Sequence, residues 1–136
     1  KAPMRFTNTD GEVVLGDHDI LISITDKRGI ITFANQLFCQ LAGYTFDELM
    51  QQPHNIVRHP DMPKAAFQDL WDTVAAKQIW QGYVKNKRKD GGFYWVRATT
   101  FPCIDDRGEI DGFISVRSKA SPAAIQAAIG IYRKLK

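Results

Sequence analysis

Three long β-prone runs, separated by two short turns, occupy residues 79–119 of the chain. The runs are Ile79–Lys89, Phe93–Ile104 and Glu109–Lys119, and the turns are Asp90–Gly92 and Asp105–Gly108. Asp can hydrogen-bond the backbone of its own turn, and Gly adopts the positive φ that tight reversals need. The pattern therefore predicts three consecutive antiparallel strands joined by two hairpins.

A further hairpin is predicted near the start of the chain. Two β-branched runs, Ile20–Thr25 and Ile30–Ala34, flank a turn at Asp26–Gly29. The preceding residues, 1–18, show little periodicity, so they are predicted to be a loosely packed lead-in with a short extended piece at Glu12–Leu15.

The segment between the two hairpins is predicted to form helices. Asn35 can cap a first short helix, which Gly43 would end in the left-handed conformation. Thr45 and Glu48 match a capping box for a second helix over about residues 46–51.

The longest helix is predicted over about residues 62–76. Asp61 is a good N-cap for this helix, and Pro63 is tolerated in its first turn. Its apolar stripe comprises Ala66, Phe67, Leu70, Trp71 and Val74. Residues 121–136 also have helical spacing, with a plausible cap at Ser121.

The order of these elements is β-β-α-α-α-β-β-β. With 136 residues, the chain has the size of a single domain with one hydrophobic core. The order predicts an α+β fold in which short helices cover one face of a five-stranded antiparallel sheet, with a cleft between the layers. The predicted division is a lead-in at 1–18, a domain at 19–120 and a C-terminal helix at 121–136 that leads towards a further module.

Charge and cysteine content argue against several other classes of protein. The net charge is +3, and the densest basic run, Lys85–Lys89, leads into a turn, which indicates a solvated strand end rather than a nucleic-acid site. Cys39 and Cys103 form no C-x-x-C motif, and no signal peptide or long apolar run is present, so a cytoplasmic segment without membrane insertion is expected. No nucleophile–base pair, metal-ligand cluster or substrate-binding motif appears, which argues against an enzyme.

Several short motifs, in this order, resemble the PAS family of sensory domains. They are Ile24–Asp26, Gly29–Ile31, Ala34–Asn35, Gly43–Tyr44 and Glu48–Leu49 in the first half, and Lys87–Gly91 and Tyr94–Trp95 in the second half. The resemblance implies the PAS fold, in agreement with the predicted order of elements.

Three longer stretches are similar to the FAD-binding PAS domain of bacterial aerotaxis receptors. The stretches are Gln52–Phe67, Ile79–Asn86 and Tyr94–Ala98, and the resemblance extends over about residues 20–120. It implies a non-covalently bound FAD and a signal that depends on the redox state of the flavin. It also implies attachment to the signalling module of a membrane-anchored chemoreceptor, and it allows a homodimer.

Arg58 is the first candidate for holding the phosphate groups of FAD. The G-x-G-x-x-G fingerprint is absent, so side chains or loop amides must bind the phosphates. The guanidinium of Arg58 can pair with a phosphate or with a flavin carbonyl, and its alternative role is to brace the loop through a pair with Asp61. The resemblance carries over Arg58, His59 and Asp61 as a unit important for FAD binding, and part of that importance can be structural.

Two tryptophans and one asparagine are the candidates for contact with the flavin ring. Trp80 and Trp71 can pack beside the ring, although Trp71 also lies on the apolar stripe of its helix and can belong to the core. Asn86 can hydrogen-bond the polar edge of the ring. Redox-sensing flavin PAS domains have a similar Trp-x-Gly segment and a similar Asn, and this resemblance supports Trp80 and Asn86.

Asn35 and Trp95 are further candidates for the cofactor site. The role of Asn35 as a helix cap needs no ligand, and the resemblance adds a contact with the cofactor. Adjacent side chains on a strand face opposite sides of the sheet, so only one of Tyr94 and Trp95 can face the cleft.

Three other kinds of PAS domain are alternatives. A light-sensing domain of the LOV type needs a cysteine where this chain has His54, and neither Cys39 nor Cys103 fits, so adduct photochemistry is not expected. A haem-binding gas sensor could use His54 or His59 as an axial ligand. A cofactor-free module for protein interaction would instead bury an ordinary core with Phe33, Phe38, Leu41, Phe67 and Leu70.

Overall fold

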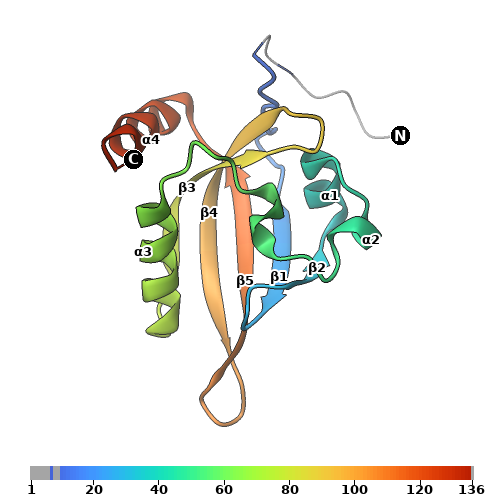
Figure 1. The fold of residues 1–136 in the computed structure, drawn as a ribbon, viewed down its shortest axis with the longest axis vertical. Helices are drawn as coiled ribbons and strands as arrows, with labels where there is room; N and C mark the ends of the chain where they lie inside the picture. Colours follow the sequence, from blue (N-terminus) through green and yellow to red (C-terminus); the bar gives the residue numbers. More distant parts are fainter. Residues whose placement is uncertain (1–6, 8–9, 136) are drawn as a thin grey trace.

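The structure, a computed structural model, describes residue 7 and residues 10–135. Its five strands form one antiparallel sheet in the order β2-β1-β5-β4-β3. They are β1 (Leu21–Asp26), β2 (Ile31–Ala34), β3 (Trp80–Lys87), β4 (Phe93–Ile104) and β5 (Ile110–Lys119). All five predicted strands are thus confirmed, and β5 lies in the centre of the sheet, between β1 and β4 (Figure 1).

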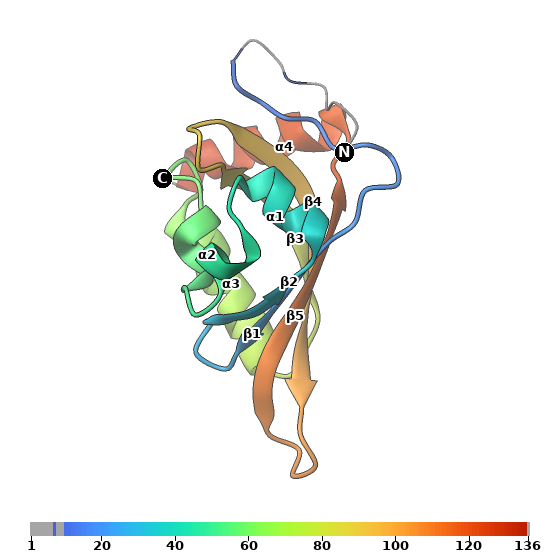
Figure 2. The same ribbon diagram turned by 90° about the vertical axis from the view of Figure 1, so that its right-hand side faces the viewer.

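The helices between β2 and β3 lie over one face of the sheet, as expected (Figures 1 and 2). They are α1 (Gln36–Ala42), α2 (Phe46–Leu49), the 3₁₀ turn η1 (His54–Val57) and α3 (Lys64–Ala75). The predicted cap of α1 is confirmed, because the Asn35 side chain accepts a hydrogen bond from Phe38 N at 3.1 Å and Gly43 ends the helix with φ 80°. The capping box between Thr45 and Glu48 is also present at the start of α2.

The prediction that Asp61 caps the longest helix is wrong. The residue at the N-cap of α3 is Pro63, which has extended backbone angles and no side-chain cap bond. Asp61 lies two residues before that position, and its carboxylate accepts a hydrogen bond from Lys85 Nζ at 2.7 Å. The side chain therefore ties the loop to β3 and does not start the helix.

The described part of the lead-in packs more closely than the sequence suggests. Val13 and Leu15 are buried in the hydrophobic core, and Val13 N donates a hydrogen bond to Phe93 O at 2.8 Å. Residues 1–6 and 8–9 of the predicted lead-in lie outside the described residues. Residues 11–15 therefore add a short extended segment beside the start of β4.

The strand register decides which side chains face the helices. Asn86 pairs with Tyr94 across β3 and β4, Ala98 pairs with Arg117 across β4 and β5, and Arg117 pairs with Leu21 across β5 and β1. Because side chains alternate along each strand, every second residue shares this face. The helix-facing set comprises Leu21, Ser23, Thr25, Trp80, Val84, Asn86, Tyr94, Val96, Ala98, Thr100, Phe113, Ser115 and Arg117.

The last helix, α4 (Pro122–Leu135), packs against the other face of the sheet. Ser121 caps it as predicted, because Ala124 N donates a hydrogen bond to Ser121 Oγ at 3.2 Å. The ring of Tyr132 stacks on Trp95, with centroids 6.5 Å apart, and the Tyr132 hydroxyl donates a hydrogen bond to Tyr83 O at 2.6 Å.

Within residues 10–135, no helix is both long enough and apolar enough to cross a membrane.

Candidate functional site

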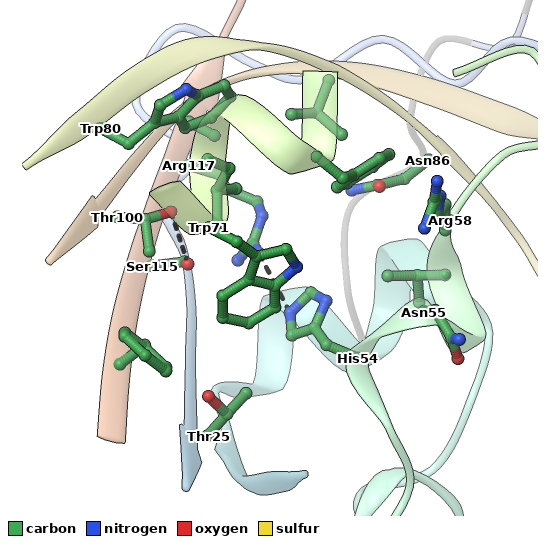
Figure 3. A pocket seen from close by; sticks show the side chains of 16 residues that line it. Thr25, His54, Asn55, Arg58, Trp71, Trp80, Asn86, Thr100, Ser115 and Arg117 are labelled. Carbon is green, nitrogen blue, oxygen red and sulfur yellow. Dashed lines mark hydrogen bonds between the residues drawn. The ribbon is translucent and has the colours of Figure 1, made fainter. Parts of the chain in front are cut away.

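A cavity of about 110 Å³ lies between the sheet and the helical layer, at the position of the predicted cleft (Figure 3). Its floor is formed by helix-facing residues of β1, β3, β4 and β5, and its wall by η1, Arg58 and α3. Most of the lining is apolar or aromatic. The residues of the lining are Thr25, His54, Asn55, Val57, Arg58, Phe67, Leu70, Trp71, Trp80, Val84, Asn86, Ala98, Thr100, Phe113, Ser115 and Arg117.

Ser23, His54 and Arg117 form a hydrogen-bonded group that we call the polar cluster. Arg117 Nη1 donates to Ser23 Oγ at 2.9 Å, and Arg117 Nη2 lies 3.0 Å from His54 Nε2. Ser23 Oγ lies 2.9 Å from the same His54 nitrogen. Because a guanidinium has only donors, His54 Nε2 must be the acceptor. The neutral imidazole therefore carries its proton on Nδ1.

The polar cluster holds a positive charge inside the protein. Burial, with the charge of Arg117 beside it, lowers the pKa of His54 to about 3, so this imidazole is neutral at pH 7. Burial also lowers the pKa of Arg117 to about 10, which leaves the guanidinium charged at pH 7. The face of the Phe38 ring lies 5.3 Å from the Arg117 Cζ atom and gives a weak cation–π contact.

Three buried polar atoms near the cavity have no hydrogen-bond partner in the described part of the chain. They are Thr25 Oγ1, Asn86 Nδ2 and the Tyr94 hydroxyl, and the last two side chains lie next to each other, since Asn86 lowers the pKa of Tyr94 against the larger effect of burial. Thr25 and Asn86 also line the cavity. Burial raises the pKa of Tyr94 to about 12, so the phenol stays protonated. Since buried polar atoms are nearly always paired, these atoms indicate a ligand or ordered water in the cavity.

Trp80 lies at the β3 side of the cavity and is held from two directions. Its indole nitrogen donates a hydrogen bond to Asp69 Oδ2 on α3 at 2.9 Å. Its ring covers Gly82, where any Cβ would come within 2.4 Å of the indole. The Trp-x-Gly pattern seen in the sequence thus has a steric reason, because only glycine leaves room for the flat indole.

Trp71 is not a core residue, although it lies on the apolar stripe of α3. Its side chain is 42% exposed, and it packs edge-to-face on Phe113 with ring centroids 5.3 Å apart. The ring also reaches the turn at Gly29, where a Cβ would lie 3.6 Å from the indole. Figure 3 shows the indole of Trp71 in front of His54 and Arg117. Trp71 therefore forms the outer wall of the cavity.

The predicted unit of Arg58, His59 and Asp61 is divided by the fold. Arg58 lines the cavity, its guanidinium carbon lies 3.9 Å from the ring centroid of Phe67, and its backbone forms an isolated bridge with Asn86. Asp61 lies outside the cavity and accepts the bond from Lys85, while its own backbone N–H donates to His59 Nδ1 at 3.0 Å. Arg58 thus lines the cavity, whereas His59 and Asp61 lie outside it in the same loop.

Asn35 and Trp95 do not line the cavity. The carboxamide of Asn35 caps α1, accepts from Ile22 N at 3.1 Å and donates to Ile20 O at 3.0 Å. Trp95 faces α4 on the far side of the sheet, whereas Tyr94 faces the helical layer. Of the eight candidates for cofactor binding, the structure brings Arg58, Trp71, Trp80 and Asn86 together around one cavity.

The polar cluster was missed by sequence reasoning. Ser23 and His54 are 31 residues apart in the sequence, and His54 and Arg117 are 63 apart. Arg117 lies on a strand that alternates polar and apolar residues, and this pattern predicts that the arginine is exposed to solvent. The signal that could have found it is the alternation of side chains along β5, which puts Arg117 on the same face of the sheet as Phe113 and Ser115.

The cavity can bind a flat ligand with a polar edge. Apolar side chains flank the space on both sides, and hydrogen-bond donors on Asn86, Arg58 and Arg117 line it. Within the described residues, neither cysteine is part of the lining, and no group of three or more His, Cys, Asp or Glu side chains is placed to hold a metal ion.

Comparison with known proteins gives matches over nearly the whole chain. The chain is 47% identical over 127 residues to the aerotaxis receptor of Escherichia coli (strain K12), which covers 93% of this chain and 25% of the receptor. It is 31% identical over 102 residues to the nitrogen fixation regulatory protein of Klebsiella pneumoniae, which covers 75% of this chain and 21% of that protein. The chain therefore spans about a quarter or less of the length of these two relatives.

A solved structure and a family profile give the same assignment. The dark structure of the blue-light photoreceptor Aureochrome1 LOV superimposes with a TM-score of 0.73 at 20% identity, over 84% of this chain and 85% of that chain. At this identity the likeness concerns the fold alone. Residues 31–117 match the family described as the PAS fold. Because that match covers more than half of the chain and agrees with the sheet and its helical layer, the chain belongs to the PAS family.

Proposed function

We propose that this PAS domain binds FAD non-covalently in the cavity and reports the redox state of the flavin to a signalling module. One observation carries this proposal: Asn86 Nδ2 and Thr25 Oγ1 are buried without a hydrogen-bond partner in a lining that combines apolar and aromatic side chains with polar ones. A flavin ring needs an apolar slot together with donors for its carbonyl edge. The similarity to an aerotaxis receptor supports a role in energy taxis.

The residues of the cavity fit the parts of a flavin. Val84 and Ala98 on the floor, with Phe67 and Leu70 on α3, provide the two apolar surfaces between which a ring can lie. Asn86 provides an amide donor for a carbonyl of the ring. These groups come from rigid elements on opposite sides of the space, which favours one orientation of a planar ligand.

Arg58 is proposed to hold the phosphate groups. It belongs to the wall of the cavity, and its backbone is fixed to β3 by the bridge with Asn86. Its guanidinium stacks on Phe67, so the planar donors are already ordered before a ligand arrives. The ion pair between Asp61 and Lys85 keeps this loop against the strand and contributes to binding indirectly.

The volume of the cavity implies that a ligand must displace part of the wall. Ligand pockets usually enclose roughly 300–1,000 Å³, and this cavity encloses about 110 Å³. Trp71 is the side chain best placed to move, because it is 42% exposed and its ring reaches across to Gly29 and Phe113. Rotation of Trp71 outward would widen the cavity.

The bound FAD would supply reversible electron uptake, and the protein would convert it into a change of shape. Asn86 is the residue proposed to respond, because its amide lies between the cavity and the bridge that holds the Arg58 loop. A change in its hydrogen bonds would bias β3 between two packings. The output module, the cytoplasmic location and a homodimer are further parts of this proposal, which the similarity to a receptor supports.

The proposal is tested by the absorbance spectrum of the purified domain, supplemented separately with FAD, FMN and haem. FAD bands that survive desalting support the proposal, whereas a Soret band or a colourless protein would refute it. Arg58→Ala should lose the flavin. Arg97→Ala is the matched control, because Arg97 is exposed and faces away from the helices. Tighter binding of FMN than of FAD would contradict FAD as the ligand.

A further inference from the structure

Arg117 is the one side chain of the polar cluster that carries a charge at pH 7. It lies on the central strand β5, is only 6% exposed, and has neighbours on both sides, Ala98 on β4 and Leu21 on β1. The guanidinium is covered by side chains of the helical layer, Phe38 of α1 and His54 of η1. It lines the cavity together with Asn86 and Thr25.

This buried charge has no negative partner within the described residues. Buried cations in proteins are nearly always paired with a carboxylate. Each ion pair found in the described part of the chain involves another cation, and none includes Arg117. The lining contains two arginines, Arg58 and Arg117, and no Asp or Glu. The cavity therefore carries a net positive charge.

The neighbours of Arg117 orient the guanidinium but do not neutralise it. Ser23 and His54 accept hydrogen bonds from Nη1 and Nη2, which fixes the plane of the group. His54 is neutral, since its Nε2 lone pair points at a donor. Two further donors lie at the cavity: the hydroxyl of Thr25, which lacks a partner, and the amide nitrogen of Asn86, which has only the Tyr94 hydroxyl beside it. Together these groups offer positive charge and donors to whatever occupies the cavity.

We propose that Arg117 is a built-in counter-charge that makes the cavity bind the negatively charged, reduced form of its ligand more tightly than the neutral, oxidised form. The inference rests on the proposed flavin site and specifies how the site sets the redox potential. When two electrons from an external reductant and one proton from water enter a neutral ring system, one negative charge remains on it. Arg117 stabilises that charge, and the midpoint potential rises.

A second consequence concerns the protein without ligand. An unpaired buried charge costs folding free energy, and an apolar side chain of similar size relieves that cost. Arg117→Met should therefore leave the flavin-free domain as stable as the wild type or more stable. A purely structural arginine would behave in the opposite way, because its loss would leave Ser23 and His54 without their donor and lower the unfolding temperature.

The experiment compares wild type, Arg117→Met, Arg117→Gln and Arg117→Lys, with Arg97→Met as the control on the other face. The midpoint potential of the bound flavin is measured by titration with dithionite against reference dyes. Arg117→Met and Arg117→Gln should bind the reduced form at least tenfold more weakly relative to the oxidised form, which lowers the potential of a two-electron couple by about 30 mV. The midpoint potential of Arg117→Lys should lie between those of these two variants and that of the wild type, and the potential of Arg97→Met should equal that of the wild type.

The outcomes separate this inference from the proposed function. An unchanged potential in Arg117→Gln, which keeps a donor for Ser23 without the charge, overturns the counter-charge. If Arg117→Met folds but loses flavin, the midpoint potentials of Arg117→Gln and Arg117→Lys test the counter-charge in its place. If the wild type binds no flavin, the proposed function fails, and the counter-charge is then judged by thermal unfolding of the flavin-free variants. A lower unfolding temperature for Arg117→Met in that case overturns it, and an equal or higher one supports it.

Discussion

The indole of Trp80 lies so close over Gly82 that a Cβ at position 82 would meet ring atoms at 2.4 Å. Contacts of that length do not occur, so a side chain there would force the indole away from the strand. The hydrogen bond from the indole to Asp69, which joins β3 to α3, would then be lost as well. The absence of a side chain at Gly82 therefore lets the Trp80 indole line the cavity and keep its hydrogen bond to α3.

The first prediction concerns Gly82→Ala. Overpacking of this kind typically costs about 1–3 kcal/mol, and the free energy of unfolding of the flavin-free domain should fall by that amount in urea titrations. Gly130→Ala is the matched control, because nothing lies within 4 Å of a Cβ at that position of α4. There the change should stabilise the domain by roughly 0.5–1 kcal/mol, as helix propensity predicts. Equal effects at both sites would contradict the contact with Trp80.

The second prediction concerns pH. The pKa of His54 is about 3 in the folded protein and about 6.5 in an unfolded chain. As the pH falls, the unfolded state binds the proton of His54 before the folded state does. The contribution of neutral His54 to folding stability is therefore present above about pH 6.5 and is lost as the pH falls towards 3. Over pH 6.5 to 5 the free energy of unfolding should drop by up to about 1.4 kcal/mol per pH unit.

His54→Gln should flatten that slope, and His18→Gln, at an exposed position, should leave it unchanged. Hydrogen bonds lower the pKa values of the Asp26, Glu48 and Asp90 carboxyl groups, so these groups titrate below the same window. Chemical denaturation at a series of pH values measures the slope. If the free energy of unfolding of His54→Gln changed with pH as steeply as that of the wild type, His54 would not be buried in its neutral form.

The third prediction separates a brace from a ligand contact in the loop before α3. Asp61→Asn weakens the ion pair with Lys85, whose side chain is only 16% exposed, but leaves the backbone bridge between Arg58 and Asn86 in place. Flavin affinity should therefore fall several-fold, less than in Arg58→Ala. Glu48→Gln, which weakens the ion pair with Lys89, is the control and should bind flavin normally. A loss as large as that of Arg58→Ala would place Asp61 in the binding site itself.

The fourth prediction concerns the outer wall. Trp71→Ala removes the edge-to-face contact with Phe113, so the domain should lose about 0.5–1.5 kcal/mol of stability. The same change opens the cavity, so flavin should associate faster in stopped-flow fluorescence. Trp71→Phe should keep most of the stability and show a smaller change in rate, and Ile79→Ala, at another exposed apolar residue, should alter neither. A slower association in Trp71→Ala would show that the indole guides the ligand and does not obstruct it.

Local patterns were sufficient to predict the fold. The strands followed from β-branched runs between Asp- and Gly-containing turns, and the helix starts followed from Asn35, Thr45 and Glu48, whose capping bonds are all present. Such signals involve residues close together in the sequence, and their geometry is set by the backbone. The proposed cap at Asp61 failed because Pro63 at the N-cap moved the start of α3 away from it.

The cavity was only half predictable, for a physical reason. Arg58, Trp80 and Asn86 belong to segments with recognisable motifs, whereas the polar cluster depends on the pairing of β5 with β1 and on the path of η1. Exposure was also hard to infer. Phe33, which the cofactor-free alternative would bury in the core, is 40% exposed and packs on Phe46. Periodicity identifies an apolar stripe, but it does not show how much of the stripe is covered.

The central position of β5 has a consequence for how the domain can open. Its backbone is bonded into ladders with both β1 and β4, so we expect the amides of Ser115 and Arg117 to be among the slowest to exchange their hydrogens. Trp71 and Arg58, which line the cavity, lie on α3 and on the loop before it, outside these ladders. We therefore expect a molecule to enter by displacing the side chain of Trp71, while the charged centre on β5 keeps its position.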